Sequence, residues 1–240
     1  MFSLIILTIV IKASNRTMVK RNIVILGARK DGHANVVLEI IKAQNKYNVV
    51  GFIDDLLFNK ELELKNVPII GTVEMLPSLI KFYNIRGFIV AIGNNKRRRL
   101  LTDLAKAMSI EPINAIHPSV CIDPDVAMGI GNYIGQGVII VTGTIIGNCV
   151  NIHTGTTIDH NCSLQDGANL GPGVHAAGRV NIKQDVFIGT GTSIIPDITI
   201  NEGSIIGAGS VIIGDVDQNC KVVGNPGKVI ERNINNNKKS

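Results

Sequence analysis

The side chains most able to do chemistry near neutral pH are five histidines, namely His33, His117, His153, His160 and His175. His160 stands between Asp159 and Asn161. An imidazole that titrates near neutrality can take a proton from an attacking amine or hydroxyl, which is the role of a general base. His160 is therefore a candidate catalytic base, with Asp159 or a backbone carbonyl to orient its ring. The competing interpretation is a structural histidine that only makes a hydrogen bond in a turn.

A second group of polar residues follows predicted strands in the first half of the chain. The glycine-rich turn at 27–33 contains Gly32 and His33 and precedes a helical pattern, and Asp54 and Asp55 follow the next predicted strand. This is the layout of a dinucleotide-binding βαβ unit, in which the helix N-terminus holds phosphate and a carboxylate accepts from ribose or base. The GxGxxG fingerprint is not matched, so an ordinary tight turn is an alternative.

The segment 94–99 adds further candidates. Asn94 and Asn95 can cap a helix that carries four consecutive basic residues. Arg98 can meet a phosphate through two parallel hydrogen bonds. The alternative is that Asp54 and Asp55 begin a turn, while the arginines lie on a solvated helix face.

The elements that must position these residues differ between the two halves of the chain. From Ile116 to Ile212, every sixth residue is apolar, and the seventeen positions hold thirteen Ile, two Leu, one Met and one Ala. A period of six fits neither a helix nor a long strand, but it is typical of a hexapeptide β-helix. Three short strands make one coil of 18 residues, so residue i lies beside residue i+18. The stacked coils bury an aliphatic column.

This geometry places Gly178 one coil beyond His160, so bare backbone lies where an acyl thioester could approach the imidazole. It argues against zinc, because His153, His160 and His175 are 7 and 15 positions apart and should not converge within one subunit. The four cysteines form no CxxC pair. We expect no metal, and reduced thiols in a cytoplasmic protein.

The first half alternates strand and helix patterns, which predicts a small parallel, Rossmann-like sheet. The expected strands span 22–26, 49–53, 68–70 and 87–92. The expected helices include the pattern around 36–41 and the segment 76–83. The predicted organisation is an extension at 1–17, an α/β domain at 18–113, a β-helix at 114–229 and a tail at 230–240.

The N-terminal extension contains an apolar run at 2–11 with no positive region before it. Three interpretations compete: a misplaced start codon, a signal peptide and a short membrane anchor. We favour the first, because Met18 begins a plausible chain start and the run is too short to span a membrane. No stable membrane insertion is expected.

The net charge of +5 does not indicate a nucleic-acid binder. Much of the excess is in residues 96–99 and 238–239, and no aromatic residues are interleaved with a basic face. With 45% apolar and 18% charged residues, the chain can bury a core over most of its length.

Several motifs resemble a known family. Hexapeptides such as Ile134-Gly-Gln-Gly-Val-Ile and the closing Val223-Gly-Asn-Pro-Gly resemble the left-handed β-helix acyltransferases. Joined to the Gly-His-Ala turn, to Gly51-Phe-Ile-Asp-Asp and to Ile116-His-Pro-Ser, they make residues 20–230 similar to the nucleotide-sugar acetyltransferases. That group includes the UDP-4-amino-sugar (bacillosamine-type) N-acetyltransferases and the sialic acid O-acetyltransferases. The resemblance implies trimers that hold acetyl-coenzyme A between neighbouring subunits.

The resemblance also implies roles for individual residues. It identifies His160 as the catalytic histidine, with Asn161 where the family often has an acid and Asp159 as another possible orienting partner. The position of a family histidine that helps to place the cofactor falls on Asn169, with His175 in the same coil. The other implied cofactor residues are Gly178, Gly189, Thr190, Gly207 and Ala208. The implied nucleotide contacts are Gly32, His33, Asp54, Asp55, Asn94, Asn95 and Arg98.

The leading hypothesis is an acetyl-coenzyme A-dependent N-acetyltransferase of a nucleotide-linked amino sugar, in surface glycan biosynthesis. The uncharged Asn161 favours an amine over a hydroxyl acceptor, because a hydroxyl depends more on an oriented base. The alternatives are O-acetylation of a sialic acid-like sugar and a non-catalytic nucleotide-sugar-binding trimer. Outward apolar residues such as Phe187, Ile195 and Ile213 agree with faces that pack in a homotrimer.

Overall fold

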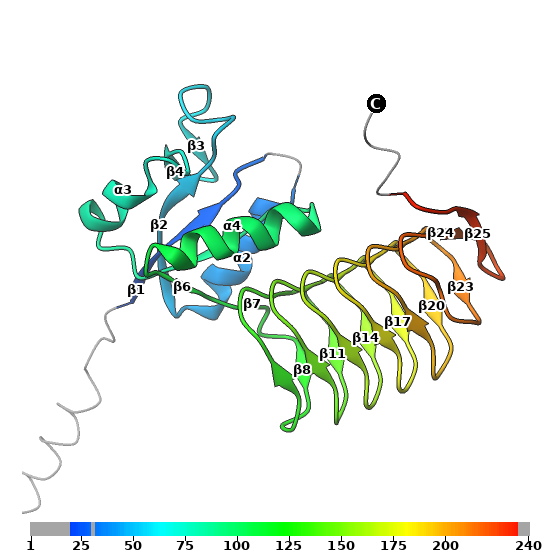
Figure 1. Ribbon diagram of the computed structural model, residues 1–240. Coiled ribbons are helices and arrows are strands. Elements are labelled where there is room, and N and C mark those ends of the chain that lie inside the picture. Colours follow the sequence, from blue (N-terminus) through cyan, green and yellow to red (C-terminus); the bar gives the residue numbers. More distant parts are fainter. Residues whose placement is uncertain (1–19, 30–31, 235–240) are drawn as a thin grey trace, which may run out of the picture.

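The computed structural model describes residues 20–29 and 32–234, in an α/β domain followed by a three-sided β-helix (Figure 1). The apolar run at 2–11 and its proposed start site lie outside the described residues. Within the described part of the chain, no helix is long and apolar enough to cross a membrane. The predicted fold class, a Rossmann-like domain joined to a left-handed hexapeptide β-helix, is confirmed.

The N-terminal domain is built on a six-stranded sheet with the order β3-β4-β2-β1-β5-β6. Its strands are β1 (Arg21–Leu26), β2 (Tyr47–Ile53), β3 (Glu63–Leu64), β4 (Val67–Gly71), β5 (Gly87–Val90) and β6 (Glu111–Pro112). Its helices are α2 (His33–Gln44), α3 (Leu76–Phe82) and α4 (Asn95–Ala107). All strand pairs are parallel except β3 with β4. Strand β1 is fully buried from Ile23 to Leu26, as expected for a parallel strand with both faces covered.

The second half forms three parallel ladders of very short strands, which we name faces 1, 2 and 3. Face 1 contains β7 (Ala115–Ile116), β10 (Tyr133–Ile134), β13 (Asn151–Ile152), β16 (Asn169–Leu170), β19 (Phe187–Ile188), β22 (Ile205–Ile206), β24 (Lys221–Val223) and the antiparallel β25 (Lys228–Glu231). Face 2 contains β8 (Cys121–Ile122), β11 (Ile139–Ile140), β14 (Thr157–Ile158), β17 (His175–Ala176), β20 (Ser193–Ile194) and β23 (Val211–Ile212). Face 3 contains β9 (Ala127–Met128), β12 (Ile145–Ile146), β15 (Ser163–Leu164), β18 (Asn181–Ile182) and β21 (Thr199–Ile200).

The register of these ladders is the predicted 18-residue coil. Ile134 pairs with Ile152, which pairs with Leu170 on the next coil. The sixth-residue positions from Ile134 to Ile212 are all buried in one aliphatic core, and only the first coil, which begins at Ile116, is partly open. Burial of this continuous column supplies most of the free energy that stabilises the β-helix, since each two-residue strand is too short to be stable by itself.

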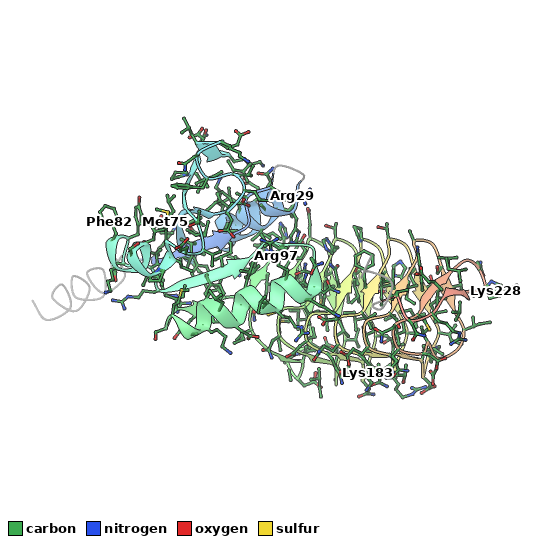
Figure 2. All side chains as sticks on the ribbon, turned by 45° about the horizontal axis from the view of Figure 1, so that its top comes forward. Arg29, Met75, Phe82, Arg97, Lys183 and Lys228 are labelled. Atoms are coloured by element: carbon green, nitrogen blue, oxygen red, sulfur yellow. The ribbon has the colours of Figure 1, made fainter. Side chains whose placement is uncertain are left out.

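The N-terminal domain packs on face 1 and on the two edges that border it. Asn95 at the start of α4 donates to the carbonyls of Asp185 and Val186 at the edge between faces 3 and 1. Arg99 pairs with Asp185 at the same edge through two hydrogen bonds. Figure 2 shows Arg97 at the end of the domain that adjoins the β-helix, while Phe82 lies at the opposite end. The edge between faces 2 and 3 is on the far side of the prism from this domain.

Candidate active site

A cavity of about 580 Å³ opens at the carboxyl ends of β1, β2 and β5. The starts of α2 and α4 border it, which is the usual ligand position in a parallel α/β sheet. The polar residues that line it include Arg29, His33, Asp54, Asp55, Asn94 and Arg97. Gly32 forms the N-cap of α2 with a φ of 117°, a conformation that glycine adopts readily. The cavity therefore combines helix N-terminal N–H groups with cationic and carboxylate side chains.

The two predicted carboxylates have different roles. Asp54 is 9% exposed; its Oδ2 accepts from the N–H of Ala28 at 2.8 Å and its Oδ1 from that of Leu56 at 2.9 Å. Asp54 thus fastens the turns around the cavity, as the alternative interpretation of the sequence had it. Asp55 is exposed, and its Oδ1 accepts a hydrogen bond from the backbone N–H of Val73 at 2.9 Å. Of the pair, Asp55 is the exposed carboxylate that lines the cavity.

The structure does not place Arg98 where a phosphate could reach it. Its side chain is fully buried, and its guanidinium donates to the carbonyls of Cys149 and Gly167 at 2.9 Å and of Ile92 at 3.1 Å. Arg98 therefore joins α4 to the β-helix, and burial lowers its pKa to about 10. The prediction failed because three consecutive arginines point to different sides of a helix. The neighbouring Arg97 is the one that lines the cavity.

The asparagines at the start of α4 also separate. Asn94 caps the helix, since its Oδ1 accepts from the N–H of Arg97 at 2.9 Å, and it borders the cavity. Asn95 faces the β-helix, where its side-chain amide donates a hydrogen bond to the backbone, and it does not line the cavity. The predicted cap is confirmed at Asn94.

His33 stands at the junction of the two domains. Its ring lies edge-on to Tyr133 of face 1, with centroids 4.8 Å apart, and its centroid is 5.4 Å from that of His153. Burial, and then the charges of His153 and Arg98, lower the pKa of His33 to about 3. Burial and then Arg98 lower the pKa of His153 to about 4. Both imidazoles are therefore neutral when the domains are packed together, and no sequence motif pointed to this pair.

Acidification from pH 7 to pH 5 is expected to destabilise the protein. The unfolded chain protonates these two histidines near their ordinary pKa of 6.5, whereas the folded chain keeps them neutral down to about pH 4 and 3. The unfolded state therefore binds more protons below pH 6.5, and the free energy of unfolding falls as the pH falls. At pH 5 the loss is about 2 kcal/mol for each histidine. Urea unfolding at pH 7, 6 and 5 measures it.

The matched comparison is His153→Gln against His117→Gln, since His117 is half-buried and its ring hydrogen-bonds with the hydroxyl of Ser119. His153→Gln should remove about half of the pH dependence attributed to the pair, and His117→Gln should leave it unchanged. If the free energy of unfolding falls with pH equally in the wild type and in His153→Gln, the pH dependence does not come from this histidine pair.

His160 lies on the edge between faces 2 and 3. Its Nδ1 is 3.0 Å from the side-chain nitrogen of Asn161, and a Cβ placed on Gly178 would come within 2.5 Å of its Nε2. The Oδ1 of Asp159 accepts from the backbone N–H of His160 at 2.7 Å. The hydrogen-bond partner of the His160 ring is thus Asn161, whereas Asp159 accepts from the backbone of His160. The other ring nitrogen faces the bare backbone of Gly178, as the 18-residue period predicts.

A groove of about 300 Å³ runs along face 2 beside His160. Asp159 and His175 line it, and His175 is within 2.8 Å of Thr157 through Nδ1 and Oγ1. The predicted cofactor residues Gly189, Thr190, Gly207 and Ala208 lie on the other border of this face, between faces 1 and 2. The coils are close there, since a Cβ on Gly189 would be 2.5 Å from the backbone nitrogen of Ala208.

Asn169 lies away from this groove. It belongs to face 1, is 3% exposed beneath the N-terminal domain, and donates to the carbonyl of Gly93 at 3.5 Å. His175 is on face 2, so the two side chains are on different faces and His175 does not take the place of Asn169. Membership of one coil was not enough to bring them together, because consecutive six-residue segments belong to different faces.

Two family models match the chain. The PglD N-terminal domain matches residues 22–104, and the bacterial transferase hexapeptide model with six repeats matches residues 179–214. GDP-perosamine N-acetyltransferase of Escherichia coli O157:H7 is 30% identical over 143 residues, which are 60% of this chain and 62% of that relative. The matched segment thus spans less than two thirds of that relative.

Solved structures cover more of the chain. PerB from Caulobacter crescentus, in complex with CoA and GDP-perosamine, is 33% identical with a TM-score of 0.81, over 88% of this chain and 97% of that one. The acetyltransferase domain of PglB from Neisseria gonorrhoeae, in complex with acetyl coenzyme A, is 31% identical with a TM-score of 0.82, over 88% and 100%. The fold and site define an acyltransferase with hexapeptide repeats. Within that class, the chain belongs to the sugar N-acyltransferases that carry a PglD-type N-terminal domain.

Proposed function

We propose that the protein transfers an acetyl group from acetyl-coenzyme A to the amino group of a nucleotide-linked amino sugar, for surface glycan synthesis in the cytoplasm. The observation that carries the proposal is His160, whose Nε2 faces bare backbone on an open edge of the β-helix. Support comes from the nucleotide-sized cavity in the N-terminal domain and from PerB, which holds CoA and GDP-perosamine together.

In the proposed reaction, the sugar amine attacks the thioester carbonyl carbon and a C–N bond forms. His160 takes the amine proton at Nε2, the C–S bond breaks, and the thiolate leaves to be protonated. In this reaction, the N–H of Gly178 would stabilise the oxyanion. For Nε2 to accept, Nδ1 must carry the proton. A half-turn of the Asn161 amide presents its carbonyl oxygen to that N–H, and an amide offers both a donor and an acceptor for this purpose.

We propose that the working form is a homotrimer in which each site is shared. The nucleotide cavity is on the side of face 1, whereas His160 is on the opposite edge of the same prism. A sugar bound in the cavity cannot reach His160 of its own chain. A neighbouring copy related by threefold symmetry can bring its edge to the cavity and supply the second wall for the cofactor. Dissociated monomers should then lose acetyl-coenzyme A binding even when folded.

The test is an acetyl-transfer assay with acetyl-coenzyme A and, separately, GDP-perosamine, a UDP-linked 4-amino sugar and free sialic acid. We expect thiol release matched by one added acetyl group on a 4-amino sugar nucleotide, read by mass spectrometry. Acetylation of sialic acid alone would instead identify an O-acetyltransferase. Nucleotide-sugar binding without transfer to any acceptor would identify a non-catalytic binding protein.

A further inference from the structure

The turns at the edges between the faces of the β-helix, which we call corners, contain one residue whose conformation is costly and not explained by packing. From Gly131 to Gly209, every sixth residue has positive φ, and twelve of these fourteen corners hold Gly, Asn or Asp, which adopt that conformation most easily. The exceptions are Cys149 and Arg179. Cys149 is buried, and its carbonyl accepts from Arg98, so packing explains it. Arg179 is exposed at a φ of 61°.

Arg179 is held in a defined position beside the proposed base. Its Nε and Nη2 donate to the two carboxylate oxygens of Asp197 at 2.6 and 2.8 Å. Its backbone N–H donates to the carbonyl of His160 at 2.9 Å, and that of Asp197 donates to the carbonyl of Gly178 at 3.1 Å. The hydrogen bond from Arg179, and then the charges of Arg179 and His160, lower the pKa of Asp197. The ion pair therefore stands next to the spot that Nε2 of His160 faces.

The pair and the expected cofactor groove lie on different sides of His160. Along the corner, Asp159 is nearest face 2 and Asn161 is nearest face 3, and Arg179 is one coil above Asn161. The groove and the glycine-rich border belong to face 2. On the proposed function, the thioester approaches from face 2, so the group that meets Arg179 is the acceptor sugar.

The chemistry of the pair suits hydroxyl groups. Two guanidinium nitrogens are already bound to Asp197, so the local charge is balanced and a phosphate dianion gains little there. The remaining N–H donors and carboxylate lone pairs lie side by side, and adjacent pyranose hydroxyls both donate and accept. Resting on the proposed function, we propose that Arg179 and Asp197 recognise the sugar by binding ring hydroxyls next to the reacting amine, and so determine acceptor specificity.

The test is Arg179→Asn, because Asn suits this corner and the fold should be kept or stabilised. We expect the KM for GDP-perosamine to rise about tenfold or more, as for loss of a charge-assisted hydrogen bond, with an unchanged KM for acetyl-coenzyme A. Asp197→Asn should act in the same direction. The matched control is Arg232→Asn, which removes another exposed pair, Arg232 with Asp217 at 2.9 Å, at the end of the helix. Its KM values should equal those of the wild type.

A second arm uses GDP-perosamine that lacks the hydroxyl next to the amine. For the wild type, the KM for this analogue should exceed the KM for GDP-perosamine by about the factor that Arg179→Asn causes. For Arg179→Asn, the KM should rise little more when the hydroxyl is removed. A wild-type KM for GDP-perosamine in Arg179→Asn overturns the proposal, as does a raised KM for acetyl-coenzyme A or a changed sedimentation coefficient. If the wild type acetylates no sugar nucleotide, the proposed function has failed and this inference fails with it.

Discussion

Replacement of His160 by alanine is expected to lower kcat by about 10²–10⁴-fold, the usual contribution of a general base. The KM for the sugar nucleotide should stay near the wild-type value, because the nucleotide contacts lie in the N-terminal cavity. His160 is half-buried on an edge, so the variant should fold normally. Steady-state kinetics with acetyl-coenzyme A and GDP-perosamine, and a thermal melt of each variant, provide the measurement.

His117→Ala is the control, since this histidine is on the first coil, away from the edge between faces 2 and 3, and its ring hydrogen-bonds with Ser119. Near-normal kcat in His160→Ala would mean that another group takes the proton. A raised KM with unchanged kcat would instead show that His160 binds substrate without acting as a base.

The β-helix could be predicted from sequence because its repeat is local and strict. A period of six fixes which residues enter the core, and addition of 18 fixes which residues are neighbours, so the approach of Gly178 to His160 followed without coordinates. The N-terminal strands were predicted from hydrophobic runs bounded by turns. Strands β3 and β6 were not, because two residues carry no periodicity.

The errors concern side-chain direction and long-range packing. A run of three arginines did not reveal that Arg98 is enclosed by the β-helix, nor that Arg97 faces the cavity. Asp54 and Asp55 are equivalent in sequence, and only the turn geometry gives Asp54 its backbone partners. The contact of His33 with His153 joins positions 120 residues apart in different domains, and no local pattern encodes it.

Two inactive variants are expected to restore activity to each other when they are co-expressed. His160→Ala keeps the nucleotide cavity, and Arg97→Glu, which places a negative charge where the diphosphate is expected, keeps the base. In a shared-site trimer, a cavity from one variant meets His160 from the other. In a ring of three, each mixed trimer holds one complete site among its three, so random mixing in equal amounts should make about one quarter of all sites, and about one third of those in mixed trimers, complete. Acetyl transfer by mixed trimers, isolated through two different affinity tags, measures the recovery.

On the shared-site model, acetyl transfer recovers only where an intact cavity of one copy meets an intact His160 of another; the mixing of two variants is not enough. Co-expression of His160→Ala with His160→Asn gives the same mixed assembly but no copy with an intact base, so it should show no recovery. Each variant alone should stay inactive. If tagged mixed trimers of His160→Ala and Arg97→Glu are isolated and remain inactive, the cavity and the base act within one chain. The N-terminal domain would then have to leave face 1, where Arg98 and the Arg99–Asp185 pair hold it, to bring its cavity to the opposite edge.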